Sequence, residues 1–215
     1  HLFNVTVTVA HPDPDGQAFA LPAWIPGSYM IREFARHFVS VEAQAGGRPV
    51  RIDKLDKHTW RCAPTDGPLT LAYEVYAWDL SVRGAHIDQT HAFFNGTSAL
   101  LAVEGQTEQP CLLELVSNED MEDWQVYTSL PEASGMPGAA ERYGFGLYRA
   151  SNYDELIDHP IEMGTPQVIS FFAHGAEHEL VFTGVIHNLD LPRIARDVEK
   201  ICAEQIAFFE PETCH

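Results

Sequence analysis

The feature that most constrains the fold is a period of two in hydrophobicity, which returns in short stretches of the chain. Between Phe3 and Val9, apolar residues at odd positions alternate with Asn and Thr, which is typical of a strand with one buried face. Leu69–Ala77 repeats the pattern, with its odd-numbered apolar residues on one face. Further strands are expected at 18–21, 39–43, 98–103, 111–116 and 124–127. Gly- and Pro-rich turns separate these runs, which predicts a mainly β fold with an N-terminal β-sandwich or saddle-like sheet.

The pattern changes near the end of the chain. After a long loop at 131–146, strands are expected at 168–173 and 179–185, joined by a turn at 174–177. From Asp190 to Phe209 the apolar residues instead follow the i, i+3, i+4 spacing of a helix, with Asp190 as N-cap. The sequence therefore predicts a β-hairpin followed by one long C-terminal helix.

The charge balance excludes several classes of partner. The 215 residues contain 13 Lys and Arg against 31 Asp and Glu, for a net charge of −18. Such a surface repels nucleic acid and anionic lipid, and no apolar run approaches the ~20 residues of a membrane span, so we expect neither partner. The four cysteines form no C-x-x-C pair. We expect free thiols and a cytoplasmic location, with the periplasm left open.

Two segments of the chain partly match zinc-peptidase motifs, but neither has the residues or the local structure that zinc binding requires. His174–His178 reads H-x-x-E-H, but Gly175 and the alternating flanks indicate a hairpin turn, whereas the zinc chemistry needs both imidazoles on one helical face. The H-E that starts at His178 meets Phe182 where the second His should stand. We therefore predict no catalytic residue, no metal ligand and no cofactor within this chain, although metal binding by His174 and His178 stays open.

Two polar and aromatic clusters are the candidate binding segments. The first runs from Trp24 to Arg36, and the second from Asp88 to Thr97. Amide and aromatic side chains of this kind can hold a peptide terminus in an apolar groove. The structural alternatives are a bend with a buried Arg–Glu pair and a turn with satisfied polar groups. The predicted substrate-binding residues are Trp24, Tyr29, Gln89 and Asn95.

The same clusters carry a family resemblance. Ala23–Arg36, Asp88–Ser98 and Tyr153–Gly164 resemble segments of the glycyl aminopeptidase family, which are zinc metallopeptidases that contain a PDZ domain. The resemblance implies an N-terminal β domain at 1–165. It also implies that 166–215 begins a thermolysin-like catalytic domain whose H-E-x-x-H and distal Glu lie further along. No position of this sequence matches those zinc ligands.

The expectation is therefore the N-terminal, non-catalytic part of a zinc aminopeptidase that removes N-terminal Gly or Ala and shapes the substrate groove. Zinc is expected in the full-length protein, and this piece is expected to be inactive alone. Its partner would be a peptide substrate bound through the catalytic domain. An exposed apolar stripe at Ile194, Val198 and Ile201 would favour self-association through the helix.

The alternative belongs to another class of protein. A free-standing β-sandwich could bind a carbohydrate or a peptide without chemistry, on a platform of aromatic side chains. The candidate platform residues are Trp24, Trp60, Trp78 and Trp124. Continuation of the native reading frame into an H-E-x-x-H separates the two hypotheses.

Overall fold

The chain is mainly β, as the sequence predicts. The computed structural model describes residues 1–25, 27–28 and 30–209. The candidate residue Tyr29 lies outside these ranges. The chain forms two compact units, His1–Gly164 and Thr165–His215, and each is described by itself.

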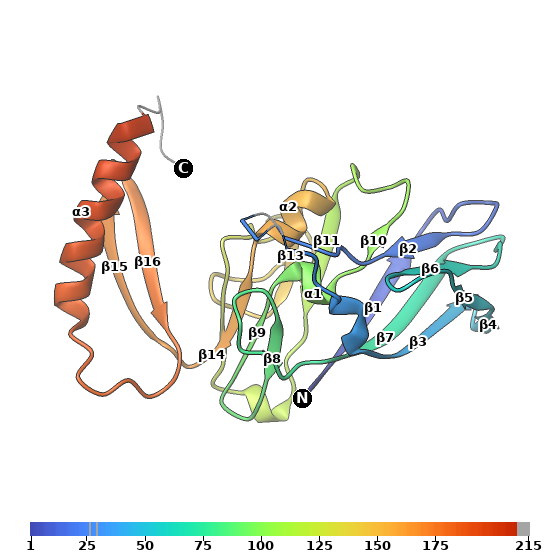
Figure 1. The fold of residues 1–215 in the computed structure, drawn as a ribbon, viewed down its shortest axis with the longest axis horizontal. Coiled ribbons are helices and arrows are strands. Elements are labelled where there is room, and N and C mark those ends of the chain that lie inside the picture. Colours follow the sequence, from blue (N-terminus) through green and yellow to red (C-terminus); the bar gives the residue numbers. More distant parts are fainter. Residues whose placement is uncertain (26, 29, 210–215) are drawn as a thin grey trace. The chain divides into compact units, whose positions relative to one another are not determined.

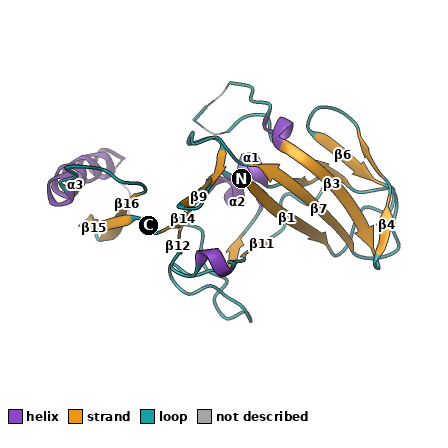
Figure 2. Cartoon of the chain, turned by 90° about the horizontal axis from the view of Figure 1, so that it is seen from below, coloured by secondary structure: helices purple, strands orange, loops and turns teal. Residues whose placement is uncertain are grey.

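The first part of unit 1 is a sandwich of two antiparallel sheets (Figures 1 and 2). One sheet has the order β1-β7-β3-β4, with strands β1 (Leu2–Val9), β7 (Leu69–Tyr76), β3 (Phe38–Ala45) and β4 (Arg48–Val50). The other has the order β10-β2-β6-β5, with strands β10 (Ala102–Val103), β2 (Ala18–Ala20), β6 (Thr59–Cys62) and β5 (Ile52–Lys54). A short 3-10 helix, η1 (Phe34–His37), precedes β3.

Alternation along β7 builds the core of this sandwich. The odd-numbered side chains from Leu69 to Val75 are buried, whereas the intervening residues remain partly or fully exposed. The stacked rings of Phe38 and Tyr73 lie 4.8 Å apart, and Phe38 also stacks on Trp60 of the facing sheet at 5.2 Å. Trp60 is 4% exposed, so it cannot belong to a binding platform.

The second part of unit 1 has its own core. A sheet of order β12-β14-β9-β8 and the pair β11-β13 enclose it, together with two short helices. The strands are β8 (Ala85–Ile87), β9 (His91–Phe94), β11 (Cys111–Leu115), β12 (Gln125–Tyr127), β13 (Gly146–Ala150) and β14 (Ile161–Gly164). The two helices are α1 (Gly96–Ala99) and α2 (Tyr153–Asp158), and a separate 3-10 turn, η2 (Glu119–Met121), precedes β12.

The segment from Gly96 to Leu101 corrects one prediction. A strand was expected at 98–103, but residues 96–99 form α1 and only 102–103 pair as a strand. Local chemistry explains the difference, because the Asn95 side chain accepts a hydrogen bond from the Thr97 amide and caps the helix. Tyr73 then donates its hydroxyl proton to the Ala99 carbonyl at 2.9 Å, which fixes the end of the turn in the core.

Unit 2 is a hairpin covered by a helix (Figure 1). Its elements are β15 (Gln167–Ala173), β16 (Ala176–Phe182) and α3 (Leu191–Phe209). Asp190 caps α3 as predicted, since its Oδ1 accepts from the Arg193 amide at 3.0 Å. The strand predicted at 179–185 instead begins at Ala176 and ends at Phe182, because the turn is tighter than expected.

The apolar stripe of α3 is divided between two environments. Val198 packs against the hairpin, together with Ala195 and Cys202. Ile201, by contrast, is 61% exposed. In the stripe predicted to favour self-association, Ile201 is therefore exposed to solvent, whereas Val198 packs against the hairpin of its own unit. Among the described helices, none is both long and apolar enough to cross a membrane.

Candidate functional site

The two candidate segments meet at residues 83 and 84. Arg83 donates from Nε to the Ser28 hydroxyl at 2.9 Å, which ties the first segment to the loop before β8. The next carbonyl, that of Gly84, accepts from the Asn95 amide at 3.0 Å and from the Ser98 hydroxyl at 3.0 Å. Segments that are about sixty residues apart in the sequence therefore share one anchoring point.

A small hollow lies beside this anchor. It has room for about one water molecule, which is too little for a peptide side chain. Its walls come from η1, the end of β7, the start of β8 and α1. The lining residues are Phe34, His37, Val75, Tyr76, Asp79, Gly84, Ala85 and Ser98.

The structure places the predicted site residues in different roles. Trp24 is 47% exposed, and Gln89 is exposed in the turn between β8 and β9. Asn95 is half-buried, and its Oδ1 accepts from both the amide and the hydroxyl of Thr97, so this side chain braces α1. Gln89 and Asn95 flank opposite ends of β9, with roughly 13 Å of strand between them, so they do not converge on one point.

The predicted alternative of a buried Arg–Glu pair is wrong. Glu33 forms an exposed ion pair with Lys57, which lowers the pKa of the Glu33 carboxyl. The neighbouring Arg32 instead reaches the Ser28 hydroxyl at 3.3 Å. The bend is thus held by a serine that two arginines share, since Arg83 uses the same oxygen.

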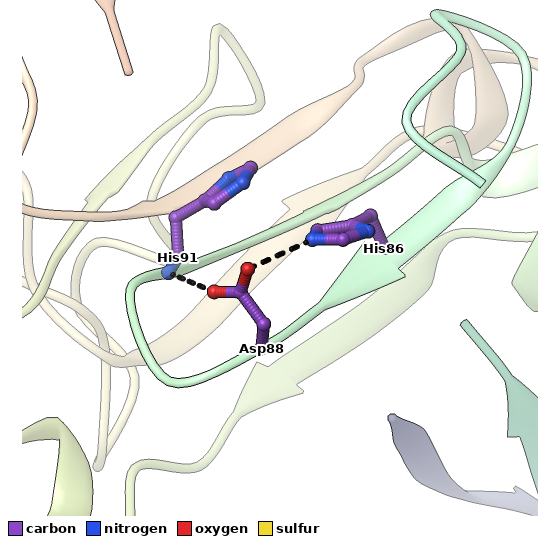
Figure 3. Close-up of side chains that lie close together, drawn as sticks. All are labelled: His86, Asp88 and His91. Carbon is purple, nitrogen blue, oxygen red and sulfur yellow. Dashed lines mark hydrogen bonds and ion pairs between the residues drawn. The ribbon is translucent and has the colours of Figure 1, made fainter. Parts of the chain in front are cut away.

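A second cluster, on the β8–β9 hairpin, brings two imidazoles and a carboxylate close together. Ile87 pairs with Ala92, and the Asp88 amide donates to the His91 carbonyl at 3.0 Å, which closes the hairpin turn. Because side chains alternate along a strand, His86, Asp88 and His91 project from one face (Figure 3). One ligand-type atom from each of the three lies within 4.8 Å of those of the others.

Asp88 is held firmly at the centre of this cluster. Its Oδ1 accepts from the Thr90 amide and hydroxyl, both at 2.7 Å, and from the His91 amide at 3.1 Å. Its Oδ2 lies 3.3 Å from His86 Nε2 (Figure 3). The hydrogen bonds from the Thr90 hydroxyl and amide contribute most to lowering the pKa of the carboxyl well below its usual value, so Asp88 is ionised at neutral pH.

The adjacent strand supplies a second carboxylate. Glu162 of β14 pairs with Phe93 in the sheet, and its Oε1 lies 2.9 Å from His91 Nδ1. Gly164 makes room for this arrangement, because a Cβ there would stand 3.1 Å from the Cβ of His91 and its φ is +153°. His91 therefore lies across the neighbouring strand with its ring orientation set by Glu162.

Aromatic rings cover the cluster. The ring centroids of His86 and His91 are 4.9 Å apart, those of His86 and Trp78 are 4.8 Å apart, and those of Trp78 and His1 are 4.0 Å apart, with the rings tilted in each pair. As a result His86 is 3% and His91 8% exposed, while the Asp88 side chain keeps 29% of its surface in solvent. The cluster is shielded on its imidazole side and open on its carboxylate side.

Sequence reasoning missed His86 and Glu162. The local signal for His86 was its spacing of two residues from Asp88, which places both on one face of a strand. Glu162 lies 71 residues from His91, and its role depends on the register between β9 and β14. Only knowledge of how β9 and β14 pair could have identified Glu162 as the partner of His91.

His174 and His178 lie in a hairpin, as predicted. His174 occupies the turn with φ of 49°, and its Nε2 lies 3.2 Å from the Ala203 carbonyl. The His178 ring stacks on Phe171 at 5.0 Å. These residues belong to strands and a turn, so the two imidazoles do not share the helical face that the zinc motif requires.

Comparison with known proteins identifies the family. The family described as "Peptidase M61 N-terminal domain" matches residues 1–165. The chain belongs to the M61 peptidase family. Its first unit is thus the N-terminal region of an M61 peptidase, as far as the family match extends.

A solved structure is similar to almost the whole chain. It is the crystal structure of an aminopeptidase N family protein from Idiomarina loihiensis, with 44% sequence identity and a TM-score of 0.89. The match covers 98% of this chain and 35% of that one, so the chain spans about a third of the length of this relative. No curated protein matches the chain.

Proposed function

We propose that the chain is the N-terminal, non-catalytic part of a zinc aminopeptidase that releases N-terminal Gly or Ala from peptides, and that it shapes the substrate groove. Membership of the M61 family and the aminopeptidase N family relative support the reaction class. The observation that carries the groove role is the joining of segments 23–36 and 88–98 through Arg83 and Gly84. Two polar and aromatic segments are thereby anchored to adjacent residues of one loop.

The zinc and its chemistry belong to the remainder of the full-length protein in this proposal. The chain contains no H-E-x-x-H, and it corresponds to about a third of the relative. Residues 166–215 would begin the catalytic domain, and the expected compartment is the cytoplasm. When bound there, zinc would supply Lewis-acid activation of water for peptide hydrolysis, and this chain alone would be inactive.

Individual side chains have distinct roles in the proposed groove. Trp24 exposes about half of its surface and can cover an apolar part of the peptide, while the exposed Gln89 amide can pair with the peptide backbone. Asn95 acts indirectly by capping α1 and so fixing Ser98 against Gly84. Tyr29 is proposed to contribute from the same segment as Trp24.

Substitution of Gln89 in the full-length enzyme tests the groove role. Loss of one hydrogen bond to the substrate, about 1 kcal/mol, should lower kcat/KM for a Gly-initiated peptide by roughly five- to tenfold. Gln44→Ala is the matched control, because Gln44 is an exposed glutamine on β3 of the sandwich. If Gln89→Ala and Gln44→Ala give the same kcat/KM as the unmodified enzyme, Gln89 has no part in the groove.

A further inference from the structure

We infer that His86, Asp88 and His91 form a binding site for a zinc-type divalent cation on the outer face of the β8–β9 hairpin. All three residues belong to unit 1. Two imidazole nitrogens and one carboxylate oxygen make up its donor set. That combination favours Zn²⁺, Co²⁺ or Ni²⁺ over the oxygen-seeking Mg²⁺ and Ca²⁺.

The distance between the first two donors suits such an ion. His86 Nε2 and Asp88 Oδ2 are 3.3 Å apart. An ion held about 2.1 Å from each atom would make an angle of about 104° with them, near the tetrahedral value of about 109°. In the absence of an ion the same geometry gives a hydrogen bond, so the pair is compatible with both states.

The third donor needs a small movement. The three donor atoms lie within 4.8 Å of one another, whereas ligands of a tetrahedral zinc ion are roughly 3.4 Å apart. The third donor would therefore have to come up to about 1.4 Å closer to the other two when an ion binds. One residue, Ile87, separates His86 from Asp88, and the two turn residues Gln89 and Thr90 separate Asp88 from His91, so all three ligands come from one hairpin.

The surroundings of the site orient its donors. Glu162 Oε1 lies 2.9 Å from Nδ1 of His91, and carboxylate–imidazole pairs of this kind orient the ligands of zinc sites. The three donors to Oδ1 of Asp88 likewise hold Oδ2 toward His86.

The coordination would be incomplete without a solvent ligand. Three protein donors leave a position for water, and the exposed side of Asp88 gives the ion a path from solvent. The Trp78 ring lies against His86 on the other side, and exclusion of water there strengthens the attraction between the ion and the carboxylate. The site is thus suited to holding a cation and one external oxygen ligand.

Titration of the 215-residue chain with Zn²⁺ alone, by calorimetry, tests the site. Co²⁺ serves as a spectroscopic probe, since nitrogen and oxygen ligation in a tetrahedral site gives intense visible bands. We expect one equivalent to bind with saturation. Asp88→Asn should weaken binding by more than tenfold, and Glu162→Gln, which leaves all three ligands in place, by about tenfold.

Control variants separate this site from other histidines. His58→Gln removes an exposed imidazole beside Asp56, at 3.8 Å, and His174→Gln removes the turn imidazole of unit 2. Neither change should alter the Zn²⁺ affinity. The inference is overturned if no saturable equivalent binds, or if Asp88→Asn and Glu162→Gln bind Zn²⁺ as tightly as the unmodified chain. Because no substrate is involved, either result is independent of the proposed peptidase activity.

Discussion

Replacement of Gly96 by alanine probes the closest approach in the second core of unit 1. A Cβ at this position would lie 2.8 Å from the Cα of Ile157 and 3.2 Å from its Cβ, so α1 and α2 would have to separate. Overpacking against backbone costs about 1–3 kcal/mol, and the better helix propensity of alanine returns at most about 1 kcal/mol. The net loss of stability should therefore be about 1–2 kcal/mol.

Tryptophan fluorescence measures this loss in unit 1 alone, because all four tryptophans lie before residue 165. At about 3 °C per kcal/mol, Gly96→Ala should lower Tm by roughly 3–6 °C. Gly67→Ala is the matched control, since a Cβ there meets nothing within 4 Å. Equal melting temperatures for Gly96→Ala and Gly67→Ala would refute the close packing of α1 on α2.

Three further changes test other parts of the structure. Tyr153→Phe removes a buried hydroxyl that donates to the Leu100 carbonyl at 2.6 Å, and should cost unit 1 about 1–2 kcal/mol in urea unfolding. Asp190→Ala removes the N-cap of α3 and should destabilise the helix by about 1 kcal/mol. Hydrogen exchange measures this as faster exchange of the amides in the first helical turn. Asp88→Asn tests pH dependence. The Asp88 pKa is lowered on folding from 3.8, so its stabilisation is complete above about pH 5 and is lost as the pH falls below the unfolded value. The stability gap between the unmodified chain and Asp88→Asn should thus narrow from pH 7 to pH 3 in denaturant unfolding.

Long periodic segments were predictable from the sequence because their own side chains determine which face is buried. β1, β7 and α3 follow this rule, and the cap at Asp190 was visible in the sequence. Strands of three or four residues, such as β4 and β8, carry too little periodicity and exist because a partner strand pairs with them. α1 was missed because one glycine and one capping asparagine outweigh the apolar run that follows.

The candidate site was only partly accessible to sequence reasoning. The segment beginning at Asp88 was selected for its polar side chains, yet the amide residue Gln89 was preferred to the imidazoles. The pairing of His91 with Glu162 depends on the register of β9 against β14, which no local pattern encodes. Likewise, the contact of Arg83 with Ser28 joins residues 55 positions apart and could not be anticipated.

Hydrolysis of short peptides by the full-length protein tests the central claim most directly. The substrates are Gly- and Ala-initiated peptides with a free amine and the same peptides with an acetylated amine, and released amino acids are quantified by mass spectrometry. We predict release of Gly and Ala only from the free-amine peptides, with loss of activity on chelation and recovery on addition of Zn²⁺. Absence of released N-terminal residues, or equal cleavage of the acetylated peptides, would contradict the assignment as part of a zinc aminopeptidase.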